Sequence, residues 1–408
     1  MEVYKTRAGD MAQAISIEMG APIALAKTAQ VGAGAGHLKN TIRAAKTFVF
    51  ESPLGDHAPG DMILYEPVGV CALITPWNWP MNQVMLKVAP ALAAGCTVVL
   101  KPSELSPLSA ILLAETVDAA GFPPGVFNLV NGDGAGVGAH LTAHPDVDMV
   151  SFTGSTRAGV AINKAAAETV KRVSLELGGK GANIIFADAD EKAVTRGVRH
   201  CFNNSGQSCN APTRMLVERS IYDQAVEIAA EVANGIAVGP ASEPGRHIGP
   251  VVNKSQWTKI QEMIEVGINE GARLVAGGPG LPEGMNRGFF VRPTVFADVN
   301  NNMTIARQEI FGPVASVIPF DTAAEAIAIA NDTIYGLAAG IWTSDINRAF
   351  RLVKEIEAGV VWVNNYEDGD MTQPFGGYKQ SGHARDKCME SLKSYTQNKS
   401  AWIRLTTP

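Results

Sequence analysis

The chain has 408 residues, a formal net charge of −6 at pH 7 and a hydrophobic fraction of 46%. A single domain rarely exceeds roughly 250 to 300 residues, so this length predicts two domains. No uncharged apolar run approaches the roughly 20 residues that span a bilayer, which argues against an integral membrane protein. The negative charge offers no basic field for phosphate backbones, so we expect neither a membrane nor a nucleic-acid partner.

The first 20 residues (MEVYKTRAGDMAQAISIEMG) carry charges throughout and lack the apolar stretch of a secretory signal. Their pattern is typical of an amphipathic helix that has no cap residue before it. We therefore expect a further N-terminal piece in the full protein.

Two segments fit neither predicted domain well. Residues 52–66 (SPLGDHAPGDMILYE) place turn residues before a strand, and residues 394–405 (SYTQNKSAWIRL) alternate like an edge strand. Exposed edges invite pairing with another chain, so we interpret both as oligomerisation elements of a homodimer or homotetramer. The alternative is that both pack on their own subunit.

Between residues 68 and 188, short β-branched runs alternate with helical stretches. Alternation of this kind predicts a parallel sheet covered on both faces, which is a doubly wound, Rossmann-like α/β domain. The predicted helices cover residues 81–94, 107–120 and 159–170, and the predicted strands are VGVCALIT, CTVVLK, FNLV, DMVSFTG, RVSLELG and ANIIFAD.

A second alternation follows between residues 193 and 363 and predicts a second α/β domain. Its helices are expected at 192–203, 221–233, 254–270, 323–331 and 346–356, and its strands at RMLVE, RLVAGG, FVRPTVF, ASVIPF, AGIWTS and GVVWVN. We place the boundary at Gly178 and Gly179. This gives a first domain at 1–178 interrupted by 52–66, a second domain at 179–380, and a C-terminal return and oligomerisation tail at 381–408.

One cysteine stands out by its surroundings. The five cysteines form no CxxC pair and no zinc spacing, and their odd number argues against a disulfide framework, so a reducing cytoplasm fits best. Cys209 follows the small polar segment 203–208 (NNSGQS), whereas Cys71 and Cys96 lie in apolar strands. A cysteine in a polar loop is the better nucleophile candidate, and the alternative is a buried inert thiol.

Two further residues carry candidate chemistry. Glu176 ends a strand between leucines, where desolvation would raise the pKa of its carboxyl into the range of a general base; a paired structural glutamate is the alternative. Asn78 lies in the segment 75–80 (TPWNWP) after a strong strand. Its amide can donate to an oxyanion, although turn chemistry alone would also explain it.

Cofactor signals follow several predicted strands, as expected for open α/β sheets. Lys101 and Glu104 offer a cation and a carboxylate that could hold ribose hydroxyls. The glycine-rich run 132–138 could let backbone approach a phosphate, and by itself it also fits a flexible turn. Ser155 follows another strand and could contact a pyrophosphate.

Over essentially its whole length the chain resembles the aldehyde dehydrogenase superfamily. The matching stretches occur in the family's order: TPWNWP, KPSELSP, FTGST, LELGGK, GQSC, EIFGPV and PFGGYKQSG. The resemblance implies NAD(P)-dependent oxidation of an aldehyde to an acid through a cysteine thioester, with no metal. It implies Cys209 as nucleophile, Glu176 as general base, and Asn78 with the Cys209 backbone amide as the oxyanion hole.

The same resemblance implies a cofactor site for NAD, with NADP as a possibility. Lys101 and Glu104 would bind the adenosine ribose, Ser155 the pyrophosphate, and Glu309 with Phe311 the nicotinamide end. Asn364 would support the active-site loop. Members of the superfamily carry several tens more residues before Met1, in an outer part of the cofactor domain. The remaining residues implied in the dinucleotide cleft are Pro76, Trp77, Gly134, Gly138, Gly154 and Leu177.

The substrate is less well defined. Residues 364–386 and the tail resemble γ-glutamyl-aminobutyraldehyde dehydrogenases, whereas 204–217 is similar to members that oxidise semialdehydes. The carboxylates Glu367, Asp368 and Asp370 suggest a cationic amino-aldehyde, or form a solvated turn. Two other functions stay open, a thiol hydrolase and a catalytically impaired paralogue with a structural or binding role.

Overall fold

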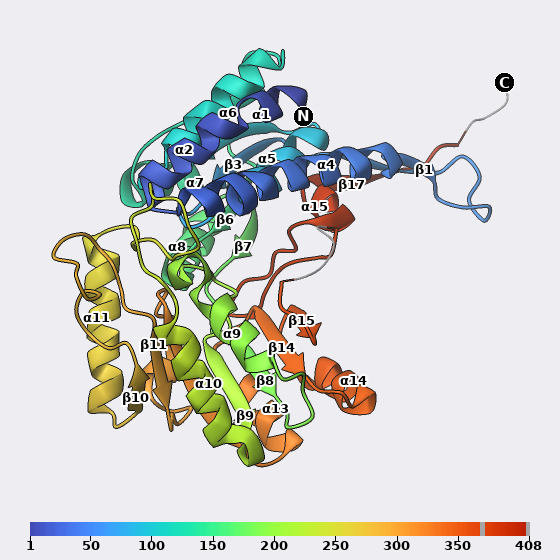
Figure 1. The fold of residues 1–408 in the computed structure, drawn as a ribbon. Coiled ribbons are helices and arrows are strands. Elements are labelled where there is room, and N and C mark those ends of the chain that lie inside the picture. The colour runs from blue at the N-terminus through green and yellow to red at the C-terminus, as the bar shows by residue number, and fades with distance from the viewer. Residues whose placement is uncertain (368–371, 405–408) are drawn as a thin grey trace.

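The computed structural model describes residues 1–367 and 372–404 and contains two parallel sheets, one above the other in Figure 1. The first is a five-stranded, fully parallel sheet in the order β5-β4-β3-β6-β7. It confirms the doubly wound α/β class. Its strands are β3 (Val70–Ile74), β4 (Thr97–Lys101), β5 (Phe127–Leu129), β6 (Met149–Thr153) and β7 (Arg172–Glu176).

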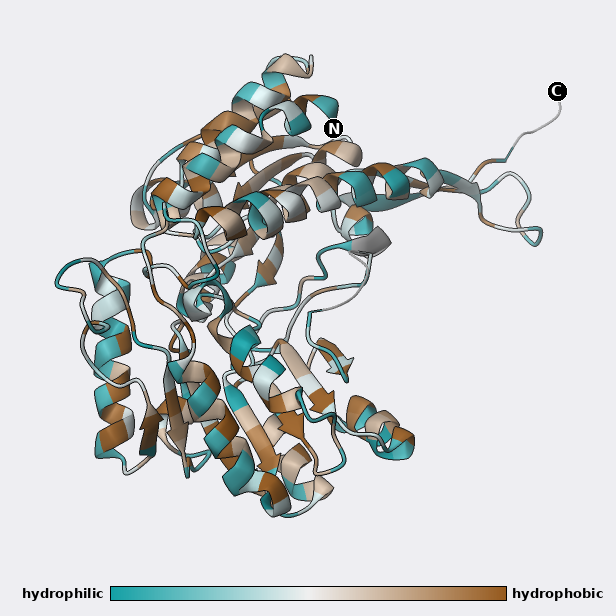
Figure 2. Cartoon of the chain, in the orientation of Figure 1, coloured by the Kyte–Doolittle hydropathy of each residue, from teal (hydrophilic) through white to brown (hydrophobic). Residues whose placement is uncertain are grey.

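Alternating side chains of this sheet enter two separate cores, as the period of a strand requires. Cys71 and Leu73 pack into one cluster, whereas Ala72 and Ile74 pack into another. Burial on both faces explains why these strands are largely apolar, and Figure 2 shows brown segments in them. The helices of this half are α1 (Glu2–Thr6), α2 (Ala8–Met19), α3 (Ile23–Leu25), the π-helix η1 (Ala26–Gln30), α4 (Val31–Thr47), α5 (Pro80–Ala93), α6 (Leu108–Ala119), the π-helix η2 (Gly134–Gly138), α7 (Ala139–Ala143) and α8 (Thr156–Ala167).

The second sheet has seven strands in the order β10-β11-β12-β9-β8-β14-β15. All neighbours are parallel except the edge pair β10 and β11, which is antiparallel; residues 277–293 join these two strands without a crossover helix. The strands are β8 (Ala182–Ile185), β9 (Arg214–Glu218), β10 (Arg273–Ala276), β11 (Thr294–Ala297), β12 (Val314–Phe320), β14 (Ala338–Trp342) and β15 (Val360–Val363).

Two expectations about this half need correction. Strand β8, which we grouped with the first alternation, pairs with β9 and β14 of the second sheet. The strand expected at 290–296 begins only at Thr294. Pro293 comes directly before it and has no N–H to donate to a strand ladder. The helices and 3-10 turns here are α9 (Ala193–Phe202), η3 (Asn203–Gly206), η4 (Arg219–Ile221), α10 (Tyr222–Asn234), α11 (Lys254–Asn269), α12 (Thr304–Arg307), α13 (Ala323–Asn331) and α14 (Ile346–Glu355).

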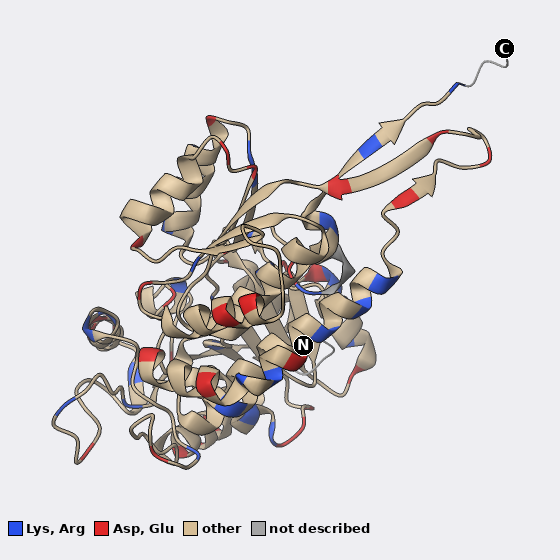
Figure 3. Cartoon of the chain, turned by 90° about the horizontal axis from the view of Figure 1, so that it is seen from above, with Lys and Arg blue, Asp and Glu red and all other residues tan. Residues whose placement is uncertain are grey.

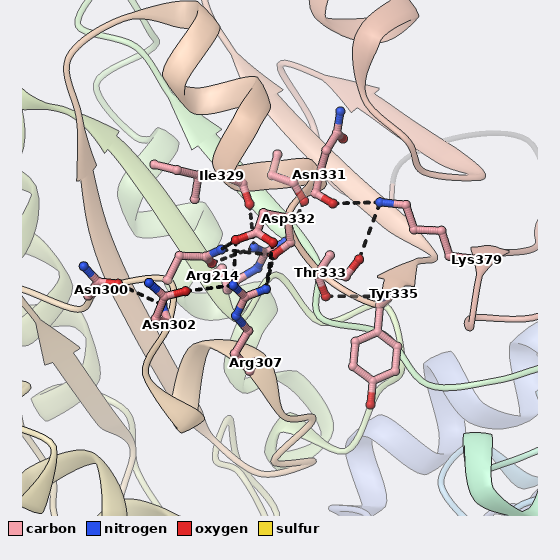
Figure 4. Close-up of polar contacts among 12 residues, drawn as sticks. Arg214, Asn300, Asn302, Arg307, Ile329, Asn331, Asp332, Thr333, Tyr335 and Lys379 are labelled. Carbon is pink, nitrogen blue, oxygen red and sulfur yellow. Dashed lines mark hydrogen bonds and ion pairs between the residues drawn. The ribbon is translucent and has the colours of Figure 1, made fainter.

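A buried arginine ties this sheet to the end of α13. Arg214 is only 1% exposed and donates to the carbonyls of Lys180, Ile329 and Ala330, so it satisfies the last turn of the helix (Figure 4). Burial lowers the pKa of this guanidinium to about 10. The contact with Lys180 fixes the backbone that leads away from the Gly178–Gly179 pair.

A small antiparallel sheet leaves the body of the molecule as an arm (Figure 1). Its order is β1-β2-β17, from β1 (Glu51–Pro53), β2 (Met62–Pro67) and β17 (Thr396–Ala401), which follows α15 (Cys388–Ser394). We expected β2 and the tail to pair across subunits, but they pair within one chain over six residue pairs. Both edges of β2 are therefore filled, which leaves β1 and β17 as outer edges. A further two-stranded sheet joins β13 (Tyr335–Gly336) to β16 (Tyr378–Lys379).

Charged side chains of both signs are interspersed along the helices, as the view from above shows (Figure 3). Within residues 1–367 and 372–404, none of the helices is long and apolar enough to cross a membrane.

Candidate active site

The strand order places several predicted site residues at one edge of the five-stranded sheet. Connections leave β3 in one direction towards β4 and return in the other to β6, so the carboxyl ends of these neighbours form a switch point where open sheets bind ligands. Asn78 lies beyond the end of β3, Gly154 and Ser155 follow β6, and Glu176 is the last residue of β7. Pro76 and Trp77 lie half-buried in the same stretch as Asn78.

Cys209 follows a loop in an unusual backbone conformation. Asn204 and Ser205 have φ values of 52° and 58°, and Gly206 follows with 73°, so three consecutive residues are left-handed. Non-glycine residues persist there only when surrounding contacts over-determine them. At Gly206, a Cβ atom would lie 2.2 Å from the carbonyl carbon of Gly312, so only glycine fits.

Side chains from both halves of the molecule hold this loop. The Asn204 amide donates to the carbonyl oxygen of Asn78 at 2.8 Å, and the Ser205 hydroxyl donates to Gly249 at 2.7 Å. The indole of Trp79 donates to the Ser208 hydroxyl at 2.8 Å. The loop is thus fastened to the segment that carries Asn78.

Asn364 does not make the contact that we expected. Its side-chain amide pairs with both backbone groups of Thr343, at 2.9 and 3.0 Å. The neighbouring Tyr366 supports the cysteine loop instead, because its buried hydroxyl donates to the carbonyl of Asn210 at 2.6 Å. Sequence reasoning missed Tyr366, since an aromatic residue after a strand carries no signal of its own.

Cys209 differs from the other cysteines whose side chains the structure describes. Cys71, Cys96 and Cys201 are buried, whereas Cys209 is partly exposed. Desolvation raises the pKa of the Cys209 thiol, and the carboxylates of Glu309, Glu176 and Glu367 raise it further. The thiol therefore keeps its proton in the protein without ligands until a base removes it.

Glu176 is only 4% exposed, and both of its carboxylate oxygens are buried without a hydrogen-bond partner among the described residues. Burial raises the pKa of this carboxyl well above its ordinary value, and the charge of Asp386 adds to the shift, while Lys87 opposes it. A buried carboxyl without partners is costly in free energy unless a ligand or water uses it.

Lys87 and Asp386 form a buried ion pair next to Glu176 that sequence reasoning did not find. The Lys87 ammonium lies 3.1 Å from an Asp386 carboxylate oxygen and donates to the Ser151 hydroxyl at 3.1 Å. The two charged residues lie on different elements far apart in the chain. Only the tertiary fold brings them together.

Cys209 and Glu176 line the same cavity, which has a volume of about 450 Å³. Its apolar wall includes the aromatic side chains of Trp79, Trp362 and Phe375. Asn78 and the residues predicted to bind the cofactor lie outside its lining. The cavity thus joins a thiol and a buried carboxyl to a wall that suits the apolar part of a small molecule.

Asn78 is buried and held rigidly. Its side-chain amide nitrogen donates to the carbonyl of Gln207 at 3.0 Å, two residues before Cys209, and its side-chain oxygen has no partner within the described chain. Its own carbonyl accepts from Gln30 and Asn204. The amide is therefore fixed beside the cysteine loop with donor capacity to spare.

The predicted adenosine end lies at the carboxyl end of β4. The Lys101 ammonium is buried and donates to the carbonyls of Pro102 and Gly132, each at 2.7 Å, and lies 3.7 Å from a carboxylate oxygen of Glu104. Glu104 is 52% exposed by its side chain and faces solvent. Gly138 lies against the Lys101 stem, and Gly134 opens on free space.

The switch point itself fits a polar ligand. Thr75 and Thr153, which follow β3 and end β6, have buried hydroxyls without partners among the described residues. The Ser155 hydroxyl caps α8 by accepting from the Ala158 N–H at 3.3 Å, and this twelve-residue helix directs its N-terminus to the same edge. Leu177 is buried nearby and donates its N–H to Ser381. Unpartnered polar atoms at a helix N-terminus suit the pyrophosphate and ribose of a dinucleotide.

Two further contacts connect the segments that carry the residues proposed for the nicotinamide end. The rings of Trp77 and Phe311 meet edge to face, with centroids 5.4 Å apart. Glu309 accepts a hydrogen bond from the Gly179 N–H at 2.9 Å, and burial raises the pKa of its carboxyl to about 7. A Cβ atom at Gly179 would lie 2.2 Å from the Cys209 carbonyl oxygen, so the Glu309 contact adjoins the nucleophile candidate.

The acidic cluster is only partly described. Asp368 and Asp370 lie outside the described residues. Glu367 is exposed, lines the cavity, and accepts from the Asn210 side-chain amide at 2.5 Å.

Together with the comparisons below, the fold defines a class of protein: an oxidoreductase that uses a nicotinamide dinucleotide. The model of the aldehyde dehydrogenase family matches residues 1–401, and the chain belongs to that family. It is an NAD(P)-dependent aldehyde dehydrogenase, as its relatives are.

Three relatives illustrate the similarity. A 3-succinoylsemialdehyde-pyridine dehydrogenase of a Pseudomonas species is 52% identical over 94% of this chain and 80% of its own length. The crystal structure of an aldehyde dehydrogenase from Bartonella henselae is 56% identical, with a TM-score of 0.97 over 99% of this chain and 84% of that one. Aldehyde dehydrogenase C from Pseudomonas syringae, solved as a cysteine-to-alanine variant with NAD+ and octanal, is 50% identical, with a TM-score of 0.96 over 98% of this chain and 82% of that one.

Proposed function

We propose that the chain oxidises its aldehyde by covalent catalysis, with Cys209 as nucleophile and Glu176 as base. The observation that carries this proposal is the shared cavity, in which a partly exposed thiol and a buried carboxyl without hydrogen-bond partners line one wall. The raised pKa of Glu176 makes it a stronger base than an ordinary carboxylate. Glu176 accepts the thiol proton, directly or through a water.

The first half of the reaction uses the cysteine loop. The Cys209 thiolate attacks the aldehyde carbon, and the resulting oxyanion receives hydrogen bonds from the Asn78 amide and the Cys209 backbone N–H. Bound NAD supplies a hydride acceptor. The rigid support of Asn78 and of residues 204–206 keeps these donors in place before the charge develops.

The second half uses Glu176 again. The acyl group remains on Cys209 as a thioester. Glu176 first releases the thiol proton to solvent and then deprotonates a water that hydrolyses the thioester to the free acid. The unpartnered carboxylate oxygens are available to hold that water. A thiol hydrolase would need Cys209 but not the polar atoms at the switch point of the other sheet.

We propose that residues 1–178 form the dinucleotide-binding domain and residues 179–380 the catalytic domain. Lys101 and Glu104 would hold the adenosine ribose, Ser155 and α8 the pyrophosphate, and Glu309 the nicotinamide ribose. The buried hydroxyls of Thr75 and Thr153, which have no hydrogen-bond partner among the described residues, support this placement. The remaining cleft residues are Pro76, Trp77, Gly134, Gly138, Gly154, Leu177 and Phe311.

For the substrate we propose a functionalised aldehyde, either an amino-aldehyde or a semialdehyde. The exposed Glu367 at the cavity favours the first, whereas the semialdehyde in the name of the Pseudomonas relative favours the second. The free thiols of Cys71, Cys96, Cys201 and Cys209 support a reducing, cytoplasmic location.

Replacement of Cys209 by alanine tests the proposal. Cys209→Ala should abolish NADH formation from any aldehyde, while NAD binding measured by calorimetry persists, because the thiol acts only in the chemistry. Cys201→Ala is the matched control, since Cys201 is buried in α9, and it should cost stability at most. Robust turnover by Cys209→Ala would contradict the assignment, and loss of NAD binding would leave it without support.

A further inference from the structure

Lys387 lies beside the proposed site in a strained conformation. Its backbone has φ 65° and ψ −178°, a region that is essentially restricted to glycine. The residue precedes α15, and the backbone of its neighbour Asp386 is fixed by two hydrogen bonds with Phe375, at 2.7 and 2.9 Å. Strain of this kind persists only where the surrounding structure holds it, and it is a reason to look for a function.

The strained backbone directs the Lys387 side chain to the cavity that contains Cys209 and Glu176. Its ammonium lies 4.8 Å from the ring centroid of Phe375, which lines the same cavity. This ring contact uses one direction of the ammonium group. The residues that the structure describes give the ammonium no hydrogen bond and no ion pair, so donors are left to face the cavity.

Among the described residues that line this cavity, the carboxyl groups are those of Asp386, Glu176 and Glu367. Asp386 is paired with Lys87, and the raised pKa of Glu176 favours its uncharged form. Glu367 accepts from Asn210. Desolvation lowers the pKa of Lys387, and the negative charge of Glu367 is the largest effect that opposes this change.

We propose that Lys387 is a specificity-determining residue whose ammonium binds an anionic or carbonyl oxygen at the end of the substrate distant from the aldehyde. This inference rests on the proposed function of the cavity. It narrows the protein's substrate from a functionalised aldehyde to one that carries a carboxylate or a ketone, as the semialdehydes named above do. The aromatic walls take the carbon chain, and the ammonium donors take the distant oxygen. A cationic amino-aldehyde, in contrast, meets a like charge.

Steady-state kinetics on three aldehydes of similar length test the proposal: 4-oxobutanoate, butanal, and the 4-trimethylammonio derivative of butanal, which cannot cyclise. The wild-type protein should have its highest kcat/KM with 4-oxobutanoate. Lys387→Met keeps the length of the side chain but removes the charge, and it should lower the 4-oxobutanoate to butanal ratio of kcat/KM about tenfold or more. Lys387→Arg, which keeps the positive charge, should retain most of the wild-type ratio.

Lys399→Met is the matched control, because Lys399 lies on β17 and pairs with Glu66, away from the cavity. It should leave the ratio unchanged. If Lys387→Met leaves the 4-oxobutanoate to butanal ratio unchanged, the proposal is overturned. It is also overturned if the wild type prefers the cationic aldehyde and Glu367→Gln abolishes that preference. NADH formation from butanal by each variant shows that the protein is folded. If the wild type forms no NADH from any of the three aldehydes, the proposed function fails, and not merely the role of Lys387.

Discussion

Glu176 illustrates how one residue's surroundings set its chemistry. Its carboxyl is buried without a partner among the described residues, so its proton affinity is high, and the proposed hydrolysis of the thioester depends on it. Glu176→Gln has the same shape but cannot accept a proton. Because Glu176 is proposed to act in both half-reactions, we expect slower formation of the first NADH and a steady-state turnover lowered by roughly two orders of magnitude or more, measured by stopped-flow absorbance. Full steady-state turnover by this variant would exclude Glu176 as the base.

The same carboxyl predicts a pH dependence. Because the pKa of Glu176 is raised by burial and by Asp386, its basic form is populated only well above the ordinary pKa of a glutamate. The rate of thioester hydrolysis should therefore rise with pH, at pH values well above the ordinary pKa of a glutamate. The measurement is single-turnover release of acid against pH, and the rising limb should disappear in Glu176→Gln.

Lys180 predicts an effect on stability. Its ammonium is buried without a hydrogen-bond partner among the described residues, and desolvation lowers its pKa from 10.5 to about 7. Between these values the unfolded chain binds a proton that the folded chain does not, so the free energy of unfolding rises with pH across that window. Below pH 7 this residue costs stability on the order of a few kcal/mol.

Lys180→Met should remove this cost. We expect the variant to have a higher free energy of unfolding than the wild type at pH 7 in urea titrations, with a smaller difference at pH 9. Lys254→Met, at an exposed lysine, is the control and should change neither value appreciably. A difference between Lys180→Met and wild type that does not depend on pH would show that packing, and not charge, is responsible.

At the scale of elements, the ends of parallel strands set the preference between cofactors. Glu104 follows β4 with its carboxylate 3.7 Å from the Lys101 ammonium, and both lie where the adenosine ribose is proposed. A carboxylate repels a 2′-phosphate, so NAD should be preferred over NADP in kcat/KM. Glu104→Gln should reduce that preference. A wild-type preference for NADP of tenfold or more would contradict the placement of Glu104 at the ribose.

Most helices and strands could be predicted from the sequence, because the spacing of apolar residues and the positions of turn residues are local features of the chain. The helix expected at residues 323–331 coincides with α13, and Glu176 ends β7 as predicted. The sequence did not indicate to which sheet a short apolar strand belongs. Strand β8 shows this, because it is as apolar as the strands of the other sheet. Register and neighbours depend on the whole chain.

At the scale of the whole molecule, the arm exposes a strand edge and an aromatic side chain to solvent on an isolated subunit. The sheet β1-β2-β17 projects from the body, and the outer edge of β17 has no partner strand within the described chain. Beyond it, Trp402 is 81% exposed. Unpaired edges and exposed aromatic side chains favour association, so we predict a dimer or tetramer.

Light scattering at micromolar concentration measures this directly. Substitution of Ser400 by proline, on β17, should weaken association because proline cannot donate to a strand ladder and distorts its strand. Ser400 pairs with Ile63 in the register of this sheet, so thermal unfolding of the variant controls for damage to the subunit itself. A monomeric wild type would contradict the prediction.

The sequence by itself determined the α/β class and the family, and it named Cys209, Glu176 and Asn78 as the proposed catalytic residues, because these depend on local pattern and on short ordered motifs. The tertiary structure alone decided which distant groups meet. It pairs Lys87 with Asp386, places Tyr366 and not Asn364 against the cysteine loop, and turns the strained Lys387 towards the cavity. Such contacts join residues far apart in the chain, and no local pattern encodes the distance between two side chains that only the packing of separate elements brings together.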